Sequence, residues 1–294
     1  MRLKQLNTFI LGLFFIGLLS SCSIVDPDYV KEINTFRKKR INFLKSREGY
    51  LNLVGLHWIF NGNYNIGSSS GNDLVFPSGF TSNFAVMNIT EDSIQFSFDV
   101  PILLDSTKQV SQFSYSKDQL NHTFSWKSYE WFIIKRGALY ALRIKDHEIP
   151  DLIESFEIPA FPAVPSWRIK GHFTAYPKQQ RRTISNIYGD PVQQPTAGIV
   201  TFDHGGNTFE LESNIEAGKL AIIFKDATTG KETYSGGRQL YLTEPDNNGN
   251  VILDFNRAFN FPCAFNDFTT CPVPPERNHL PFHIKAGEKS YRKK

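Results

Sequence analysis

The sequence has little net charge and, beyond its N-terminus, no long apolar run. Its 294 residues include 32 lysines and arginines against 29 acidic residues, which gives a formal net charge of +3. A chain this close to neutrality has no field that would gather nucleic acid or another polyanion, so we expect no nucleic-acid partner. No later apolar run approaches the roughly 18 residues that a membrane-spanning helix needs. The sequence therefore predicts no transmembrane helix beyond its N-terminal stretch.

Signatures of common enzyme classes are missing as well. The sequence contains no P-loop, no dinucleotide-binding fingerprint and no Gly-x-Ser-x-Gly nucleophile elbow. It also contains no internal repeat and no low-complexity segment. We therefore expect no bound cofactor, and these patterns leave open whether the protein is an enzyme.

The N-terminal stretch has the organisation of an export signal. Arg2 and Lys4 form a basic end, and an apolar segment follows at residues 9–19. That segment is about 11 residues long, too short to cross a ~30 Å hydrocarbon core as a helix. The run Leu-Ser-Ser-Cys at 19–22 resembles the lipobox of bacterial lipoproteins, in which the thiol, here that of Cys22, receives a diacylglycerol.

The lipobox resemblance implies a lipoprotein with a signal peptide over residues 1–21 and with Cys22 as the lipid-attachment residue. A cysteine with two or three acyl chains, one of which can be palmitate, holds a protein firmly on a membrane. Each buried CH₂ contributes ~0.8 kcal/mol to the membrane binding. Among residues 23–28 only Asp26 and Asp28 are acidic, a weak signal for surface export. We therefore expect an outer-membrane lipoprotein that faces the periplasm, and the alternative is an ordinary signal peptide with a chance cysteine.

Aromatic residues and short alternating runs predict a mainly β protein. The chain holds 26 Phe and 11 Tyr, set among runs that Gly, Pro, Asn and Asp separate. One helix is expected near the start, where Asp28 could serve as the N-cap and apolar residues recur at helical spacing. Its basic cluster at 37–40 is interpreted as a solvated face, with contact to anionic lipid headgroups as the alternative. The apolar positions are Ile33, Phe36, Ile41 and Leu44.

The predicted strands fall into two groups, with a proline-rich stretch between them. We expect a lipidated N-terminus and helix over 22–47, a first β-sandwich over 48–149 and a connector over 150–166, where proline removes ladder donors. A second β domain over 167–294 ends in an irregular segment rich in Pro and Phe. The expected architecture is two β-sandwich or barrel-like domains after a short N-terminal helix. The predicted strands are 53–59, 84–89, 93–98, 122–125, 131–135, 139–145, 167–175, 198–202, 208–212, 219–224, 238–242 and 251–255.

Residues 62–77 resemble the opening of a forkhead-associated (FHA) domain, with a polar loop that leads into Asn72-Asp73 and an apolar pair. The resemblance implies a phosphothreonine-binding sandwich, in which the Asn-Asp pair caps the return strand through side-chain to backbone bonds. The arginine that pairs with phosphate in that family is replaced here by Ser68, and no Ser-x-x-His follows Pro77. We therefore expect an FHA-like first domain without phosphopeptide binding, because the guanidinium contact is missing.

The C-terminal part carries a more distinctive series. Residues 254–258 read Asp-Phe-Asn-Arg-Ala, 262–265 read Pro-Cys-Ala-Phe, 271–275 read Cys-Pro-Val-Pro-Pro and 286–289 read Ala-Gly-Glu-Lys. This series is similar to that of the DUF1684 family, and Leu-Val-Gly-Leu-His-Trp at 53–58 extends the resemblance over nearly the whole mature chain. The family is named for having no assigned function, so the resemblance implies no activity.

Cys263 and Cys271 are the remaining two cysteines. In an oxidising periplasm they could form a disulfide, which we favour, or stay as two buried thiols. A zinc site with His279 and His283 is the third reading. Pro281 lies between the two histidines and disfavours a helix that would align them, so we expect no metal site.

A charged group at the end of a predicted strand is the candidate ligand site. It consists of Arg238, Asp254, Asn256 and Arg257, and such a group could bind a carboxylate or phosphate through bidentate hydrogen bonds. The alternative is a structural ion-pair network that pins an irregular segment. Two functions remain: a periplasmic binding or scaffold lipoprotein whose partner is a small anionic ligand or a protein, which we favour, and an enzyme that acts on a small anionic substrate at these residues.

Overall fold

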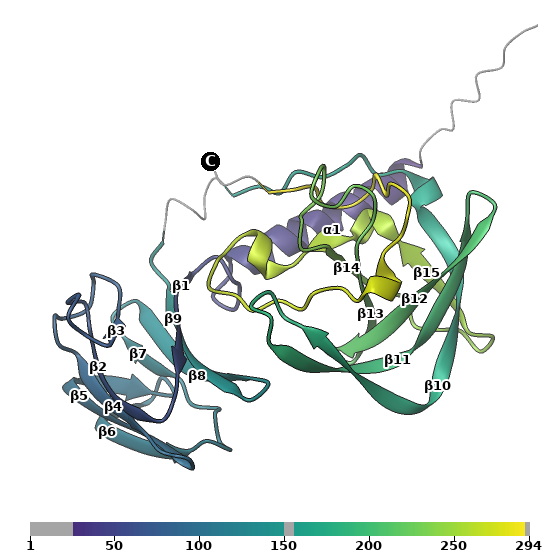
Figure 1. Ribbon diagram of the computed structural model, residues 1–294. Helices are drawn as coiled ribbons and strands as arrows, with labels where there is room; N and C mark the ends of the chain where they lie inside the picture. Colours follow the sequence, from purple (N-terminus) through teal and green to yellow (C-terminus); the bar gives the residue numbers. More distant parts are fainter. Residues whose placement is uncertain (1–25, 150–155, 292–294) are drawn as a thin grey trace, which may run out of the picture.

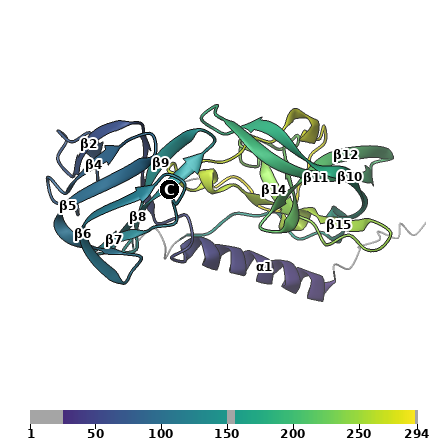
Figure 2. The same cartoon turned by 90° about the horizontal axis from the view of Figure 1, so that it is seen from below.

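The computed structural model describes residues 26–149 and 156–291. Over these residues the protein is mainly β, with one long helix, α1 (Pro27–Lys45), that lies along the outside of two sheets (Figures 1 and 2). The predicted export signal and the lipid-attachment residue Cys22 lie outside the described residues. In the described part, no helix is both long and apolar enough to cross a membrane.

Helix α1 begins two residues earlier than the sequence suggests, with Asp26 in place of Asp28 as the N-cap. The Asp26 side chain accepts from the backbone N–H of Asp28 at 2.9 Å, and Pro27 occupies the first turn. Proline is favoured there because its missing N–H would be unpaired in any case. The helix buries Tyr29 and Ile33 near its start and Leu44 near its end.

The basic cluster of α1 is not one solvated face. Arg37 and Arg40 each donate to a backbone carbonyl at 2.7 Å, those of Phe161 and Asn260 respectively. Only the two lysines at 38–39 are exposed. Positions three apart share a helix face, so two of the four cations dock α1 onto the second sheet.

The first sheet has nine strands in the order β1-β9-β8-β7-β5-β4-β2-β3, with β6 paired to β5. Neighbours are antiparallel except for β2 and β3, which are parallel. The sequence does not predict β6, because its residues are mostly polar and resemble a loop. In the structure only one of its nine side chains is buried. The strands are β1 (Leu53–Ile59), β2 (Gly62–Gly67), β3 (Leu74–Val75), β4 (Ala85–Ile89), β5 (Ser93–Leu104), β6 (Lys108–Ser116), β7 (Phe124–Trp126), β8 (Tyr129–Arg136) and β9 (Leu139–Asp146).

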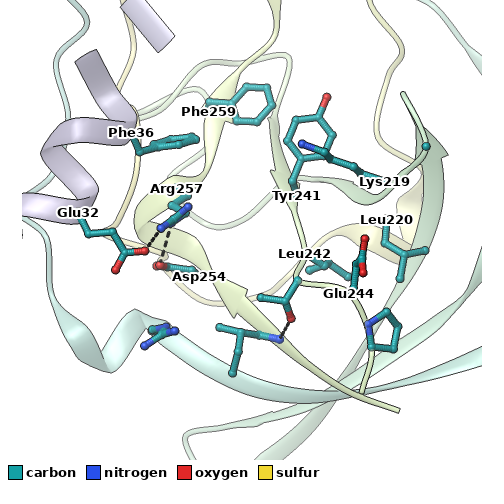
Figure 3. A pocket seen from close by; sticks show the side chains of 15 residues that line it. Glu32, Phe36, Lys219, Leu220, Tyr241, Leu242, Glu244, Asp254, Arg257 and Phe259 are labelled. Atoms are coloured by element: carbon teal, nitrogen blue, oxygen red, sulfur yellow. Dashed lines mark hydrogen bonds and ion pairs between the residues drawn. The ribbon is translucent and has the colours of Figure 1, made fainter. Parts of the chain in front are cut away.

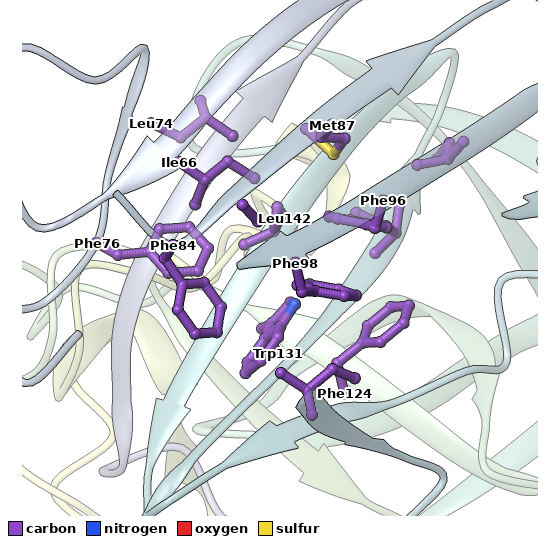
Figure 4. Packing of buried hydrophobic residues seen from close by; sticks show 14 of the residues in the cluster. Ile66, Leu74, Phe76, Phe84, Met87, Phe96, Phe98, Phe124, Trp131 and Leu142 are labelled. Atoms are coloured by element: carbon purple, nitrogen blue, oxygen red, sulfur yellow. The ribbon is translucent and has the colours of Figure 1, made fainter. Parts of the chain in front are cut away.

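Aromatic side chains fill the core of the first sheet (Figure 4). Alternation along β5 points Ile94, Phe96 and Phe98 inward, as the sequence predicts. The ring of Trp131 lies 5.5 Å from that of Phe84 in an edge-to-face arrangement. Each such side chain contributes roughly 1.5–3 kcal/mol when fully buried, so this aromatic cluster is the main source of stability in the first sheet.

The loop before β3 has the bonds expected of an Asn-Asp cap. The Asn72 side chain donates to the carbonyl of Ser82 at 2.7 Å, and an Asp73 carboxylate oxygen accepts from the backbone N–H of Asn65 at 2.7 Å. These contacts hold the polar loop against the start of the sheet. The wider likeness to an FHA domain stays a prediction.

The second sheet curves into a nearly closed barrel (Figure 1). Its order is β15-β10-β11-β12-β13-β14-β16, with every pair antiparallel. Short 3₁₀ turns precede or follow its strands at Pro165–Trp167, Phe255–Arg257, Pro262–Ala264 and Glu276–Asn278. The strands are β10 (Arg168–Ser185), β11 (Pro191–His204), β12 (Asn207–Glu216), β13 (Lys219–Phe224), β14 (Arg238–Tyr241), β15 (Asn250–Asp254) and β16 (Phe259–Asn260).

Strands β10 and β11 are longer than the sequence suggests. Beyond the barrel they continue as a two-stranded arm, and their register shifts between Ala175 and Gln180. Pro177 falls within this shift and Pro195 lies on the partner strand. Proline is tolerated at bulges and edges of sheets. Since it usually argues against a strand interior, the two prolines disfavour a strand prediction for the arm.

The segment after β16 is irregular but well packed. Phe261 and Phe265 are buried, and Phe265 packs with Leu44 of α1, Leu51 and Phe156 in a cluster where helix, first sheet and barrel meet. A disulfide joins Cys263 to Cys271, with Cα atoms 6.2 Å apart.

Replacement of both disulfide cysteines by serine should lower the free energy of unfolding by about 2–3 kcal/mol, the chain-entropy contribution of so short a loop. The measurement is urea denaturation with and without dithiothreitol. Wild-type protein should lose stability on reduction and the double variant should not. If the urea midpoint of the wild-type protein is the same with and without dithiothreitol, the prediction is wrong.

Candidate functional site

A cavity of about 870 Å³ opens between α1 and the β14–β15 side of the barrel (Figure 3). We refer to it as the subhelical cavity. Phe36 comes from the helix, whereas Asp254 and Arg257 come from the end of β15 and the turn after it. Its lining mixes apolar and charged residues, and the charged ones are Glu32, Arg168, Lys219, Glu244, Asp254 and Arg257. The apolar lining comprises Phe36, Leu220, Tyr241, Leu242, Pro245, Ile252 and Phe259.

Asp254 joins the end of β15 to the helix. Its Oδ1 accepts from the Tyr29 hydroxyl at 2.8 Å and from the backbone N–H of Asn256 at 3.2 Å. Burial, followed by the hydrogen bond to Asp254, raises the pKa of Tyr29 well above its usual range, so this hydroxyl remains a donor. The Asp254 side chain is buried, and its hydrogen bonds fix where α1 lies.

Asn256 bonds the connector, at Val164, to the end of β15. Its Oδ1 accepts from the backbone N–H of Val164 and its Nδ2 donates to the Val164 carbonyl, both at 2.9 Å. The same Nδ2 donates to the Tyr29 hydroxyl at 2.8 Å. With its amide fully used, Asn256 holds three chain segments together and has no group left for a ligand.

Arg257 lines the cavity together with Asp254. Its guanidinium pairs with Glu32 of α1, and its Nε lies 3.4 Å from Oδ2 of Asp254. It stands over the ring of Phe36, 5.4 Å from the ring centre. The side chain of Arg257 is 33% exposed and that of Glu32 is 53% exposed, so this ion pair is open to solvent and to an incoming ligand.

Arg238 lies apart from the other three predicted residues. It is fully buried, and its Nη2 bonds Oδ2 of Asp226 at 2.6 Å and the Ile284 carbonyl at 3.1 Å. Its Nη1 bonds the carbonyl of Ala286. Burial lowers the pKa of Arg238, and the Asp226 carboxylate acts in the opposite direction. The structure thus brings Asp254, Asn256 and Arg257 together, with Asp254 and Arg257 lining the cavity, and places Arg238 in the core.

Glu288 is a buried carboxylate outside the predicted group. It pairs with Arg40 of α1 at 3.1 Å and accepts from the backbone N–H of Asn260 at 2.7 Å. Burial raises the pKa of Glu288, whereas Arg40 and the Asn260 N–H lower it.

Within residues 26–149 and 156–291, no group of three or more His, Cys, Asp or Glu side chains is arranged to hold a metal ion. The sulfurs of Cys263 and Cys271 are joined to each other. His279 instead places Nε2 at 3.3 Å from the carbonyl of Pro274.

The Arg238→Met variant should lose about 3–5 kcal/mol in the free energy of unfolding, because it leaves Asp226 as an uncompensated buried charge. Arg257→Met is the matched control, and it should lose about 1 kcal/mol or less because its ion pairs are partly exposed. Urea denaturation measures both. Equal losses in the two variants would contradict the assignment of Arg238 to the core and of Arg257 to the cavity.

Comparisons with known proteins place this chain in a family without assigned function. A family model described as "Protein of unknown function (DUF1684)" matches residues 154–289. The solution NMR structure of an uncharacterised protein from Haloarcula marismortui is similar, at 30% identity over 48% of this chain and 80% of that chain, with a TM-score of 0.40. No curated protein matches the sequence. The match covers the barrel and the C-terminal segment that contain Asp254, Asn256 and Arg257, and the chain belongs to the DUF1684 family.

Proposed function

We propose that this protein is a lipid-anchored periplasmic binding protein, with Cys22 as the attachment residue and the subhelical cavity as its ligand site. Helix α1 begins at Pro27, shortly after the predicted lipid-bearing cysteine. A lipid on Cys22 would hold the helix, and the cavity beneath it, close to the membrane surface. The ligand would then be taken up or released next to the bilayer.

The cavity favours a small amphipathic anion. Pockets of several hundred Å³ with apolar walls and a few polar groups are typical of small-molecule sites. Among the charged residues of the lining we assign Arg257 to the ligand, and its exposed pairing with Glu32 is the observation that carries the proposal. Exposed ion pairs contribute only ~0–1 kcal/mol, so a ligand carboxylate or phosphate could replace Glu32 on the guanidinium at small cost and gain a charge-assisted fork.

Binding is favoured over catalysis because the neighbouring side chains are committed to structure. Asp254 accepts hydrogen bonds from Tyr29 and Asn256 and also pairs with Arg257. A general base must be able to reach a substrate proton, and the Asp254 carboxylate is buried among its partners. We therefore assign the subhelical cavity to ligand binding, with Arg257 as the recognition residue.

Cys22→Ala should release the protein from the membrane fraction, because the thiol that carries the acyl chains is gone. Fractionation of cells with a high-salt wash, followed by immunoblotting, measures this. The Cys263→Ser/Cys271→Ser variant is the control and should stay with the membranes, since it keeps Cys22. Sedimentation of Cys22→Ala with membranes after the wash would show that lipid is not the anchor.

Arg257→Gln should weaken binding of dansyl-labelled undecanoic acid by about ten- to a hundredfold, the expected effect of losing hydrogen bonds to a charged group. Fluorescence titration gives the dissociation constant. Arg277→Gln removes a partly exposed arginine that pairs with Glu212 at 3.3 Å, outside the cavity lining, and should bind as wild type does. If Arg257→Gln and the wild type bind the probe with equal affinity, the proposed ligand site is wrong.

A further inference from the structure

A second cavity, of about 440 Å³, lies where the first sheet meets the barrel, and we refer to it as the intersheet cavity. The end of the β8–β9 hairpin forms one wall. The β10–β11 arm, the end of β12 and the segment around the disulfide form the others. It shares no lining residue with the subhelical cavity. Any function of this cavity is therefore independent of the ligand site proposed above.

Arg143 is the unusual residue of this cavity. It lies on β9 between Leu142 and Ile144, whose side chains belong to the aromatic core of the first sheet. Successive side chains of a strand point to opposite faces, so Arg143 stands on the face that the barrel covers. That face would be open to water in an isolated sheet, yet Arg143 is only 6% exposed.

The guanidinium of Arg143 has no protein partner among the described residues. Its Nε and Nη2 are buried without a hydrogen bond, and no carboxylate of the described chain forms an ion pair with it. Burial, together with the neighbouring Arg136, lowers its pKa to about 10. The group therefore keeps its charge at neutral pH. An unpaired buried charge costs several kcal/mol, a cost that an anion in the cavity would offset.

The rest of the lining also suits an anion. Arg136 and Arg143 are the cationic side chains on this face of the sheet, against Glu216 as the one acidic residue of the lining, which leaves an excess of one positive charge. Lys135 also lines the cavity, but alternation places its side chain on the opposite face, where its Nζ lies 5.2 Å from the ring centre of Tyr140. Glu216 is exposed and bonds the Gln239 amide instead of an arginine.

The hydrogen bonding of Arg136 and Asn214 indicates which groups a ligand of this cavity would carry. The Nε of Arg136 donates to the Thr270 hydroxyl at 2.8 Å, which fixes the guanidinium at the wall. Asn214 lines the cavity as well, and its Oδ1 is buried without a donor.

We infer that the intersheet cavity is a binding site for a small dianion, a phosphate ester or a dicarboxylate, that also carries a hydroxyl group. Arg143 forms a bidentate contact with an oxyanion, the geometry that a guanidinium provides. Arg136 balances the second charge, and the ligand hydroxyl donates to Asn214. Because the two sheets supply different groups, a bound ligand also joins the first sheet to the barrel.

The test uses the full-length protein in detergent, with glycerol phosphate and malate as probes of the two ligand classes and sodium chloride at matched ionic strength as the control. One of the two probes should raise the melting temperature in a concentration-dependent way that chloride does not reproduce. The class that stabilises identifies the ligand chemistry. If neither probe stabilises the protein beyond chloride, the inference is wrong.

Variants separate a ligand role of Arg143 from a structural one. Arg143→Met removes an uncompensated buried charge, so the ligand-free protein should melt at the same or a higher temperature while the probe-dependent rise disappears. Arg143→Lys keeps the charge but loses the fork, and should bind the stabilising probe at least tenfold more weakly by calorimetry. Arg277→Gln should behave as wild type. A probe response that survives in both Arg143 variants would overturn the site, as would wild-type affinity in Arg143→Lys.

Discussion

The packing of the C-terminal segment depends on the buried guanidinium of Arg238. This segment has few ladder hydrogen bonds, and buried carbonyls without partners would destabilise the fold. Arg238, neutralised by Asp226, donates to the carbonyls of Ile284 and Ala286. One side chain at the start of β14 thereby satisfies two carbonyls of the segment, in addition to backbone hydrogen bonds such as that from the Leu280 N–H to the Lys225 carbonyl. The segment can cross the barrel without becoming part of the sheet.

The position of α1 follows from that arrangement. Once the C-terminal segment is held, Glu288 lies beside Arg40, and the Asp254 carboxylate receives the Tyr29 hydroxyl. Polar contacts at both places dock a helix that buries few apolar residues of its own. The subhelical cavity exists because these contacts hold α1 against the barrel at particular points and leave space between them. The intersheet cavity arises in the same way, where the disulfide-linked segment keeps the barrel against the first sheet.

The two cavities differ in how their charges are balanced. In the subhelical cavity Arg257 has two carboxylates beside it, one of them exposed, so an anion must compete with Glu32. In the intersheet cavity Arg143 is buried with no carboxylate of the described chain in contact with it, so an anion meets no competitor. Exposed pairs exchange at little cost, whereas an unpaired buried charge favours any ligand that neutralises it. Under the two proposals, an anion in the subhelical cavity would exchange with Glu32, whereas an anion in the intersheet cavity would neutralise an unpaired charge.

The sequence by itself determined what depends on near neighbours in the chain. Apolar alternation predicted β1 and β13 with their observed bounds, helical spacing predicted α1, and the contacts among Asp254, Asn256 and Arg257 follow from their closeness in sequence. Long-range packing decided the rest. The alternation of apolar and polar residues could not show that the polar ends of β10 and β11 pair with each other. It also could not show that the Arg238 side chain points into the core and bonds a distant segment. Arg143 reads as a solvent-facing position of a strand, and only the barrel that covers it makes it a buried, unpaired cation, because burial is a property of the assembled sheets and not of a strand's own sequence.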